Sequence, residues 1–132
     1  MEFLSHLKAF NEEGASIDID GAPAIGGENK GLRPMQLLLA GIGSCSTMDI
    51  VSILNKQKQQ LDDIEVIIDG EREKDKTPSL FETIHVHFIL TGNLDKNKVK
   101  RAIDLSANTY CSVSRILEKT AHITYSHEIK NK

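Results

Sequence analysis

The chain has 132 residues, and its 39% hydrophobic and 27% charged content is ordinary for a globular protein of one domain with a modest core. Its net charge of −3 argues against a nucleic-acid-binding surface, which needs an excess of basic residues. The N-terminal residues lack the basic start and apolar core of a signal peptide, and the longest unbroken apolar run, residues 37–42, is far shorter than the about 20 residues of a membrane span. We therefore expect a cytoplasmic protein with one domain over residues 1–132.

The first third of the chain predicts a hairpin followed by a loop and a long helix. Residues 3–20 have the pattern of two strands around a turn at residues 11–14. Residues 21–31 contain four glycines and a proline, which is typical of a loop. Pro34 suits the first turn of a helix, because its missing N–H has no partner to lose there, and the helix is predicted to run to about residue 59.

The remainder predicts a second strand pair, two more helices and a closing strand. Apolar residues alternate over residues 64–73 and 80–91, which indicates a hairpin. Asn93 or Asp95 should cap the next helix, a break near Tyr110 should precede a short helix, and a last strand should follow. This order predicts an α+β fold with a mostly antiparallel sheet.

The long helix is apolar nearly all round, so we expect it to be buried on most sides. Gly41 and Gly43 each cost about 1 kcal/mol relative to Ala in a helix interior, which indicates a close approach by another element. Cys45 lies beyond the first turn, where the helix dipole does not lower a thiol pKa. Any activation of this thiol must come from side chains.

Arg33 and Gln36 are the polar groups at the start of this helix. At 1.5 Å per residue they lie about 18 and 14 Å from Cys45 along the axis. A second helix, packed antiparallel and crossing near Ala40 and Gly41, would bring residue 36 of one chain beside Cys45 of the other. We therefore hypothesise a dimer of like chains with two composite sites.

Cys45 and Cys111 are the chain's two cysteines, and in a reducing compartment they are free thiols, metal ligands or redox actors. Asp49, one helical turn after Cys45, would oppose a thiolate if it were close; its expected role is a polar contact facing elsewhere. His85 and His87 share a strand face, where a third ligand could complete a zinc site. A solvated or partly covered sheet face is the more common origin of such a pair.

Two segments, RPMQLLLAGIGSC followed by MDIVSIL, and NTYCSVSRILEKTAHITYSHEI, resemble the OsmC/Ohr family of small thiol peroxidases. The resemblance covers residues 26–129 and is greatest to a shorter OsmC-like subgroup. It implies an intertwined homodimer with a long central buried helix and sites at the interface. It also implies reduction of organic hydroperoxides in oxidative-stress defence, with Cys45 peroxidatic and Cys111 resolving. We expect a thiol reductant or a small hydroperoxide as partner, and no cofactor, metal, nucleic acid or membrane.

The chain departs from the better-studied peroxidases of that family at two positions. Their Glu ten residues before the first cysteine is Met35 here, and the nearest polar side chain is Gln36. No Arg precedes Arg33, which is therefore the candidate to support the Cys45 thiolate. Two alternatives to an enzyme remain open: the same dimer could bind a small apolar ligand, or it could act as a redox sensor.

Overall fold

The computed structural model describes residues 6–131, and the chain divides into two compact units between residues 38 and 39. In the first unit, strands β1 (Leu7–Phe10) and β2 (Ser16–Ile19) form an antiparallel hairpin, and a 3₁₀ turn (Pro23–Ile25) follows. This confirms the hairpin expected over residues 3–20, except that residues 3–5 lie outside the described part. That residues 1–132 form one domain stays a prediction.

A buried carboxylate organises the glycine-rich loop of this unit. Asp20 is 1% exposed, and its side chain accepts hydrogen bonds from the backbone N–H groups of Gly21, Glu28 and Lys30 at 2.8, 2.9 and 3.2 Å. The hydrogen bonds compensate the carboxylate for the loss of water. They fix the loop that leads into the long helix.

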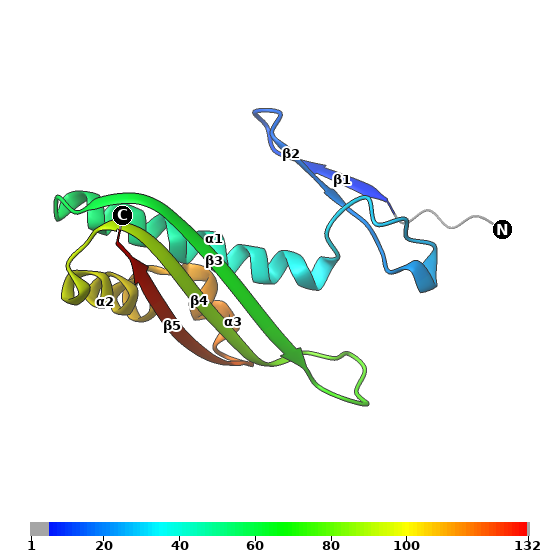
Figure 1. The fold of residues 1–132 in the computed structure, drawn as a ribbon. Coiled ribbons are helices and arrows are strands. Elements are labelled where there is room, and N and C mark those ends of the chain that lie inside the picture. The colour runs from blue at the N-terminus through cyan, green and yellow to red at the C-terminus, as the bar shows by residue number, and fades with distance from the viewer. Residues whose placement is uncertain (1–5, 132) are drawn as a thin grey trace. The chain divides into compact units, whose positions relative to one another are not determined.

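The second unit is a three-stranded sheet with helices on one face (Figure 1). The sheet order is β3 (Gln60–Arg72), β4 (Phe81–Asn93), β5 (His122–Lys130). The helical elements are α1 (Pro34–Lys56), which begins in the first unit, α2 (Lys96–Leu105), the π-helical turn η2 (Ser106–Tyr110) and α3 (Ser112–Leu117). The predicted α+β class is confirmed.

One strand pair is parallel within the predicted, mostly antiparallel arrangement. β3 and β4 are antiparallel, but β5 runs parallel to β4. The chain leaves β4 through α2, η2 and α3 before it returns as β5, and such a helical crossover brings the next strand back in the same direction. Two of the three strand pairs, including β1 with β2, are antiparallel.

Two element boundaries also have local causes. Helix α1 ends at Lys56 rather than near residue 59, because Lys58 adopts the left-handed conformation with φ of 58° and turns the chain into β3. Asp95 is the cap of α2, since its carboxylate accepts from the N–H groups of Asn97 and Lys98 at 2.9 and 3.1 Å.

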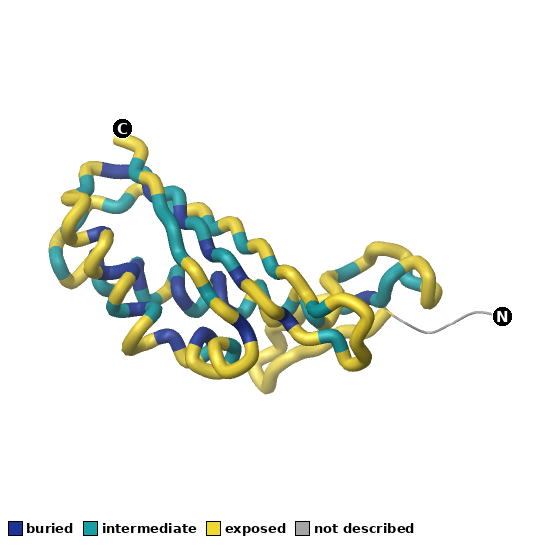
Figure 2. The backbone as a smooth tube through the Cα atoms, turned by 90° about the horizontal axis from the view of Figure 1, so that it is seen from below, coloured by how far each residue is buried: buried dark blue, intermediate teal, exposed yellow. Residues whose placement is uncertain are grey.

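The core lies between the sheet and the helices, where the buried positions gather in Figure 2. β4 contributes its inward face, and each fully buried apolar side chain stabilises the fold by about 1.5–3 kcal/mol. The fully buried apolar residues are Ile42, Ile50 and Leu54 of α1, Ile84, Val86, Phe88 and Leu90 of β4, and Val99 and Ala102 of α2.

Helix α1 is buried along one stripe only. Only 28% of the residues in its most apolar 18-residue window are buried. The unbroken apolar run of residues 37–42 is too short for a membrane span. Over its whole length, however, α1 is long and apolar enough to cross a membrane by length and composition alone, a test that the core helices of water-soluble proteins also pass. The burial expected on most sides of α1 is not reached within this chain.

Candidate thiol site

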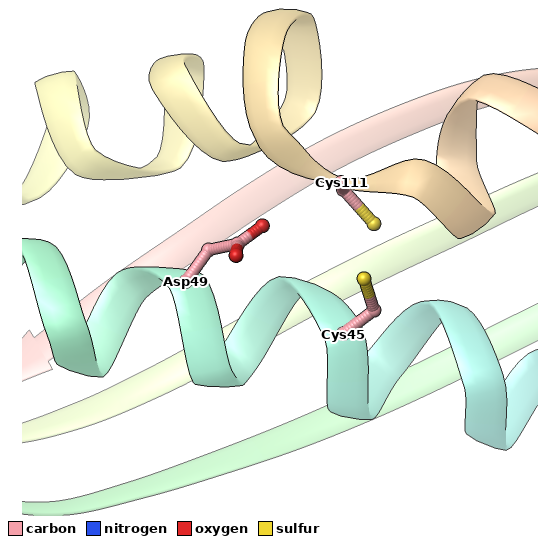
Figure 3. Close-up of side chains that lie close together, drawn as sticks. All are labelled: Cys45, Asp49 and Cys111. Carbon is pink, nitrogen blue, oxygen red and sulfur yellow. The ribbon is translucent and has the colours of Figure 1, made fainter.

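The two cysteines meet between α1 and the start of α3 (Figure 3). Cys45 and Asp49 are four residues apart on α1 and therefore share a helix face. Their ligand atoms and the Cys111 sulfur all lie within 4.8 Å of one another. Both cysteines are free thiols. The structure thus brings together two thiols that are far apart in the sequence, with a carboxylate beside them.

The position of Cys111 depends on the turn before it. The chain passes from α2 through the π-helical turn η2, which ends when the Cys111 N–H donates to the Ser106 carbonyl at 2.8 Å. Cys111 then caps α3, and its sulfur accepts from the Ser114 N–H at 3.4 Å. The break expected near Tyr110 is this turn. Single π turns are frequent at functional sites because the extra residue re-aims the chain.

Serine hydroxyls hold the side chains of the cluster. Ser46 donates to the Cys111 sulfur at 3.5 Å, and Ser106 donates to Asp49 Oδ2 at 3.0 Å. Ser46 and Ser106 are themselves buried, at 1% and 2% exposure. These contacts fix the rotamers of Cys111 and Asp49 from opposite sides of the site.

The two cysteine residues differ in exposure. Cys111 is 4% exposed, whereas Cys45 is partly exposed. Cys45 is therefore the cysteine that is more open to solvent.

The two thiols also differ in acidity. Burial raises the pKa of Cys45, and the neighbouring Cys111 and Asp49 raise it further, while a backbone hydrogen bond from Val113 offsets only part of this. Burial also acts to raise the pKa of Cys111, but hydrogen bonds to its sulfur, first from Ser46 and then from Ser114, outweigh burial and lower it. Within one chain, Cys111 is therefore the more acidic thiol.

Arg33 and Gln36 take no part in this three-residue cluster and precede the unit that contains it. The Gln36 side-chain oxygen accepts from the Arg33 backbone N–H at 3.0 Å, which is half of a capping box at the start of α1. Gln36 thus has a structural role within its own chain. A catalytic role for either residue stays a prediction.

Asp49 was expected to face elsewhere, and this expectation is wrong: its carboxylate points at the thiols (Figure 3). Its four-residue spacing from Cys45 was the available signal. No comparable sequence signal marked the serine donors, because their positions relative to the thiols depend on how α2, η2 and α3 pack.

The histidine pair has a structural explanation. His85 hydrogen-bonds to Thr124 at 2.6 Å and to Ser126 at 2.7 Å, and His87 hydrogen-bonds to Ser126 at 2.6 Å, all between β4 and β5. Neither histidine belongs to a group of three metal-ligating side chains within the described residues 6–131. The interpretation as a partly covered sheet face is confirmed.

The fold and the site define a small α+β protein with a pair of adjacent thiols, one in the long helix and one before a short helix. Comparison with known proteins identifies the family. A family model described as OsmC-like protein matches residues 27–126. The chain is 46% identical to protein YhfA of Escherichia coli strain K12 over 102 residues, which is 76% of this chain and 75% of YhfA. The chain belongs to the OsmC-like family.

Solved structures share the fold. A hypothetical protein from Aquifex aeolicus VF5 is 31% identical and superposes with a TM-score of 0.76, covering 100% of this chain and 99% of the other. An organic hydroperoxide resistance protein OsmC, a predicted redox protein from Legionella pneumophila, has a TM-score of 0.69 at 18% identity, with 97% and 99% of the two chains covered. At that identity, the second likeness shows the fold alone.

Proposed function

We propose that the protein reduces organic hydroperoxides, with Cys45 as the peroxidatic and Cys111 as the resolving thiol. The observation that carries the proposal is the approach of two free thiols, from separate elements, to within 4.8 Å of each other. Disulfide formation needs the sulfurs to close to about 2.05 Å. The relatives that are named as hydroperoxide resistance proteins add support.

The proposed cycle balances with a dithiol reductant. The Cys45 thiolate attacks an oxygen of ROOH, the O–O bond breaks, and ROH leaves with a proton, so that Cys45 becomes a sulfenic acid. The Cys111 thiolate attacks the Cys45 sulfur, and the displaced hydroxide leaves as water after it takes up a proton. The reductant then gives two electrons and two protons to the Cys45–Cys111 disulfide and is itself oxidised to a disulfide.

The exposure of the two cysteines assigns their roles in the proposed cycle, and the raised pKa of Cys45 means that its thiolate needs further stabilisation. Cys45 is the cysteine that is more open to solvent, and Cys111 is the thiol better prepared to ionise for the resolving attack. Because burial and Asp49 raise the pKa of Cys45, the peroxidatic thiolate needs a cation that its own cluster does not supply. We propose that the protein is a homodimer in which Arg33 of the second copy supplies it.

A redox sensor is the second candidate, because the same two adjacent free thiols can form one disulfide without rapid turnover. Peroxide consumption under excess dithiol separates the two functions. An enzyme consumes many equivalents of tert-butyl hydroperoxide per chain. A sensor forms one disulfide and recovers slowly.

Thiol titration after a stoichiometric pulse of tert-butyl hydroperoxide tests the assignment. Wild type should lose two thiols per chain. Cys111→Ser should lose one thiol and yield a sulfenic acid that dimedone traps, and Cys45→Ser should keep its thiol. Asp63→Asn, at an exposed position of β3, is the control and should behave like wild type. Equal rates of thiol loss in Cys45→Ser and wild type would reject Cys45 as the peroxidatic residue.

Arg33→Ala tests the proposed source of positive charge. It should slow the oxidation of Cys45, because it removes the cation that stabilises the thiolate. Arg101→Ala removes an exposed Arg from α2 and should leave the rate unchanged. Unchanged oxidation in Arg33→Ala would remove Arg33 from the site while leaving the roles of the cysteines intact.

A further inference from the structure

We propose that the reduced cluster of Cys45, Asp49 and Cys111 is a zinc-binding site that takes one Zn²⁺ per chain. The site shares its two sulfur atoms with the proposed peroxidase, but metal binding does not require that activity. It revises the expectation, drawn from the sequence, that the chain holds no metal.

The ligand atoms are close enough to surround one ion. Two sulfurs and one carboxylate oxygen lie within 4.8 Å of one another. In a tetrahedral zinc site with Zn–S bonds of about 2.3 Å, two sulfur ligands lie about 3.8 Å apart, so the side chains need to close by about 1 Å at most. Cys45 and Asp49 come from one face of α1, and Cys111 approaches from the start of α3 (Figure 3).

Asp49 and Cys111 each already have hydrogen bonds that orient them. Ser106 occupies Oδ2 of Asp49 at 3.0 Å, which leaves the other carboxylate oxygen for a metal. Cys111 receives hydrogen bonds from the Ser114 N–H and the Ser46 hydroxyl. Outer hydrogen bonds of this kind fix ligand direction and basicity in metal sites.

The charges of the cluster also favour a cation. Two thiols and a carboxylate converge, and within residues 6–131 no Lys, Arg or His nitrogen lies within 4.0 Å of the Asp49 carboxylate. Ionised together, the three groups repel one another, whereas a divalent ion among them turns that repulsion into attraction.

The ligand types select zinc among the common divalent ions. Thiolates are soft ligands that suit zinc, whereas magnesium and calcium prefer oxygen ligands alone. Three protein ligands leave a fourth tetrahedral position, and the partial exposure of Cys45 gives that position access to solvent.

Metal titration of the full-length protein tests the proposal. The protein is reduced and stripped with a chelator, and Zn²⁺ is added in competition with a chromophoric indicator. We expect one ion per chain, with Cys45→Ser, Cys111→Ser and Asp49→Asn each weakening affinity by about 100-fold or more and Ser106→Ala by about ten-fold. Asp63→Asn alters an exposed carboxylate outside the cluster and should bind like wild type.

Two further readouts separate this site from adventitious binding and from misfolding. Co²⁺ in place of Zn²⁺ should give a thiolate-to-cobalt charge-transfer band in wild type, and circular dichroism of each variant should match wild type. Binding that is unchanged in Asp49→Asn, or that survives oxidation of both thiols with diamide, would overturn the proposal. Bound Zn²⁺ should also slow thiol loss to tert-butyl hydroperoxide, and equal rates with and without the ion would count equally against it.

Discussion

Cys45 and Cys111 face each other, but their surroundings differ in hydrogen-bond donors. Cys111 accepts hydrogen bonds from the hydroxyl of Ser46 and the N–H of Ser114. Cys45, whose burial raises its pKa most, has one backbone hydrogen bond from Val113 and the carboxylate of Asp49 as a neighbour. Donors stabilise a thiolate, and a negative neighbour opposes it. The order of ionisation within one chain follows from this difference.

We predict that the single-cysteine variant Cys45→Ser, which keeps Cys111, gains thiolate absorbance at lower pH than Cys111→Ser, which keeps Cys45. Hydrogen bonding lowers the pKa of Cys111 despite its burial, while burial first and Asp49 last raise the pKa of Cys45. An ultraviolet pH titration of both variants measures the order. The reverse order would mean that the second copy of the chain, and not this cluster, sets the acidity of Cys45.

A substitution of Asp49 tests whether its negative charge raises the pKa of Cys45. In a Cys111→Ser background, Asp49→Asn should lower the pKa of Cys45, because it removes a negative charge beside the thiol. Alkylation of Cys45 by iodoacetamide at neutral pH should then be severalfold faster, since only the thiolate reacts. Asp63→Asn in the same background is the control. A slower reaction in Asp49→Asn would show that the carboxylate acts as a base for Cys45 rather than as an opposing charge.

The partly buried phenol of Tyr125 in β5 should lower the free energy of unfolding at alkaline pH. Burial raises the pKa of this phenol, although a hydrogen bond with Ser114 opposes the shift. The folded state thus favours the neutral phenol, so its contribution is complete below the unfolded pKa of about 10 and is lost as pH rises towards the folded pKa. Urea unfolding should show wild type losing more stability than Tyr125→Phe above about pH 10. Parallel pH profiles would contradict this.

The sequence motifs revealed the two cysteines but not what surrounds them. The orientation of Asp49 was missed, although its spacing from Cys45 was visible. The donors Ser46, Ser106 and Ser114 come from two separate segments, and only the π-helical turn before Cys111 brings them together. Such a turn has no periodicity of its own that a sequence could display.

At the scale of elements, Gly41 and Gly43 of α1 differ in whether a neighbouring element leaves room for a side chain. A Cβ on Gly43 would lie 2.4 Å from Ile68 Cδ1 of β3, whereas a Cβ on Gly41 would meet Val113 Cγ1 at an ordinary 3.6 Å. The close approach expected at these glycines is therefore made by the sheet at Gly43. At Gly41 the chain alone gives no reason for glycine.

This contrast predicts opposite signs for two alanine substitutions. Gly43→Ala should destabilise the fold by about 1 kcal/mol, because overpacking of about 1–3 kcal/mol outweighs the gain of about 1 kcal/mol in helix propensity. Gly41→Ala should stabilise the isolated chain by up to about 1 kcal/mol. Urea unfolding measures both, and a stabilised Gly43→Ala would mean that Ile68 moves aside without loss.

The elements were largely predictable, since hydrophobic periodicity located both long strands and the caps located the helices. The direction of β5 was left open, although a strand followed by helices and another strand is the pattern of a parallel crossover. The end of α1 was placed too late because the left-handed conformation of Lys58 has no glycine to signal it.

At the scale of the whole molecule, α1 is more apolar than its burial within one chain explains. Met48 is 71% exposed, and with Val51 and Ser52 it lines an open groove along the helix. An apolar helix face of this kind marks an interaction surface. The sequence indicated this surface, because the helix is apolar nearly all round.

The proposed homodimer buries part of this face of α1, and a charged side chain at Met48 tests the proposal. Met48→Lys should convert a dimer at micromolar concentration into a monomer by light scattering, because an unpaired charge in an apolar interface is strongly unfavourable. Ile67→Lys, at a 48% exposed position on β3, is the matched control and should stay dimeric. Since Arg33 is proposed to act across the interface, Met48→Lys should also slow the oxidation of Cys45. A monomer that oxidises as fast as wild type would confine the site to a single chain.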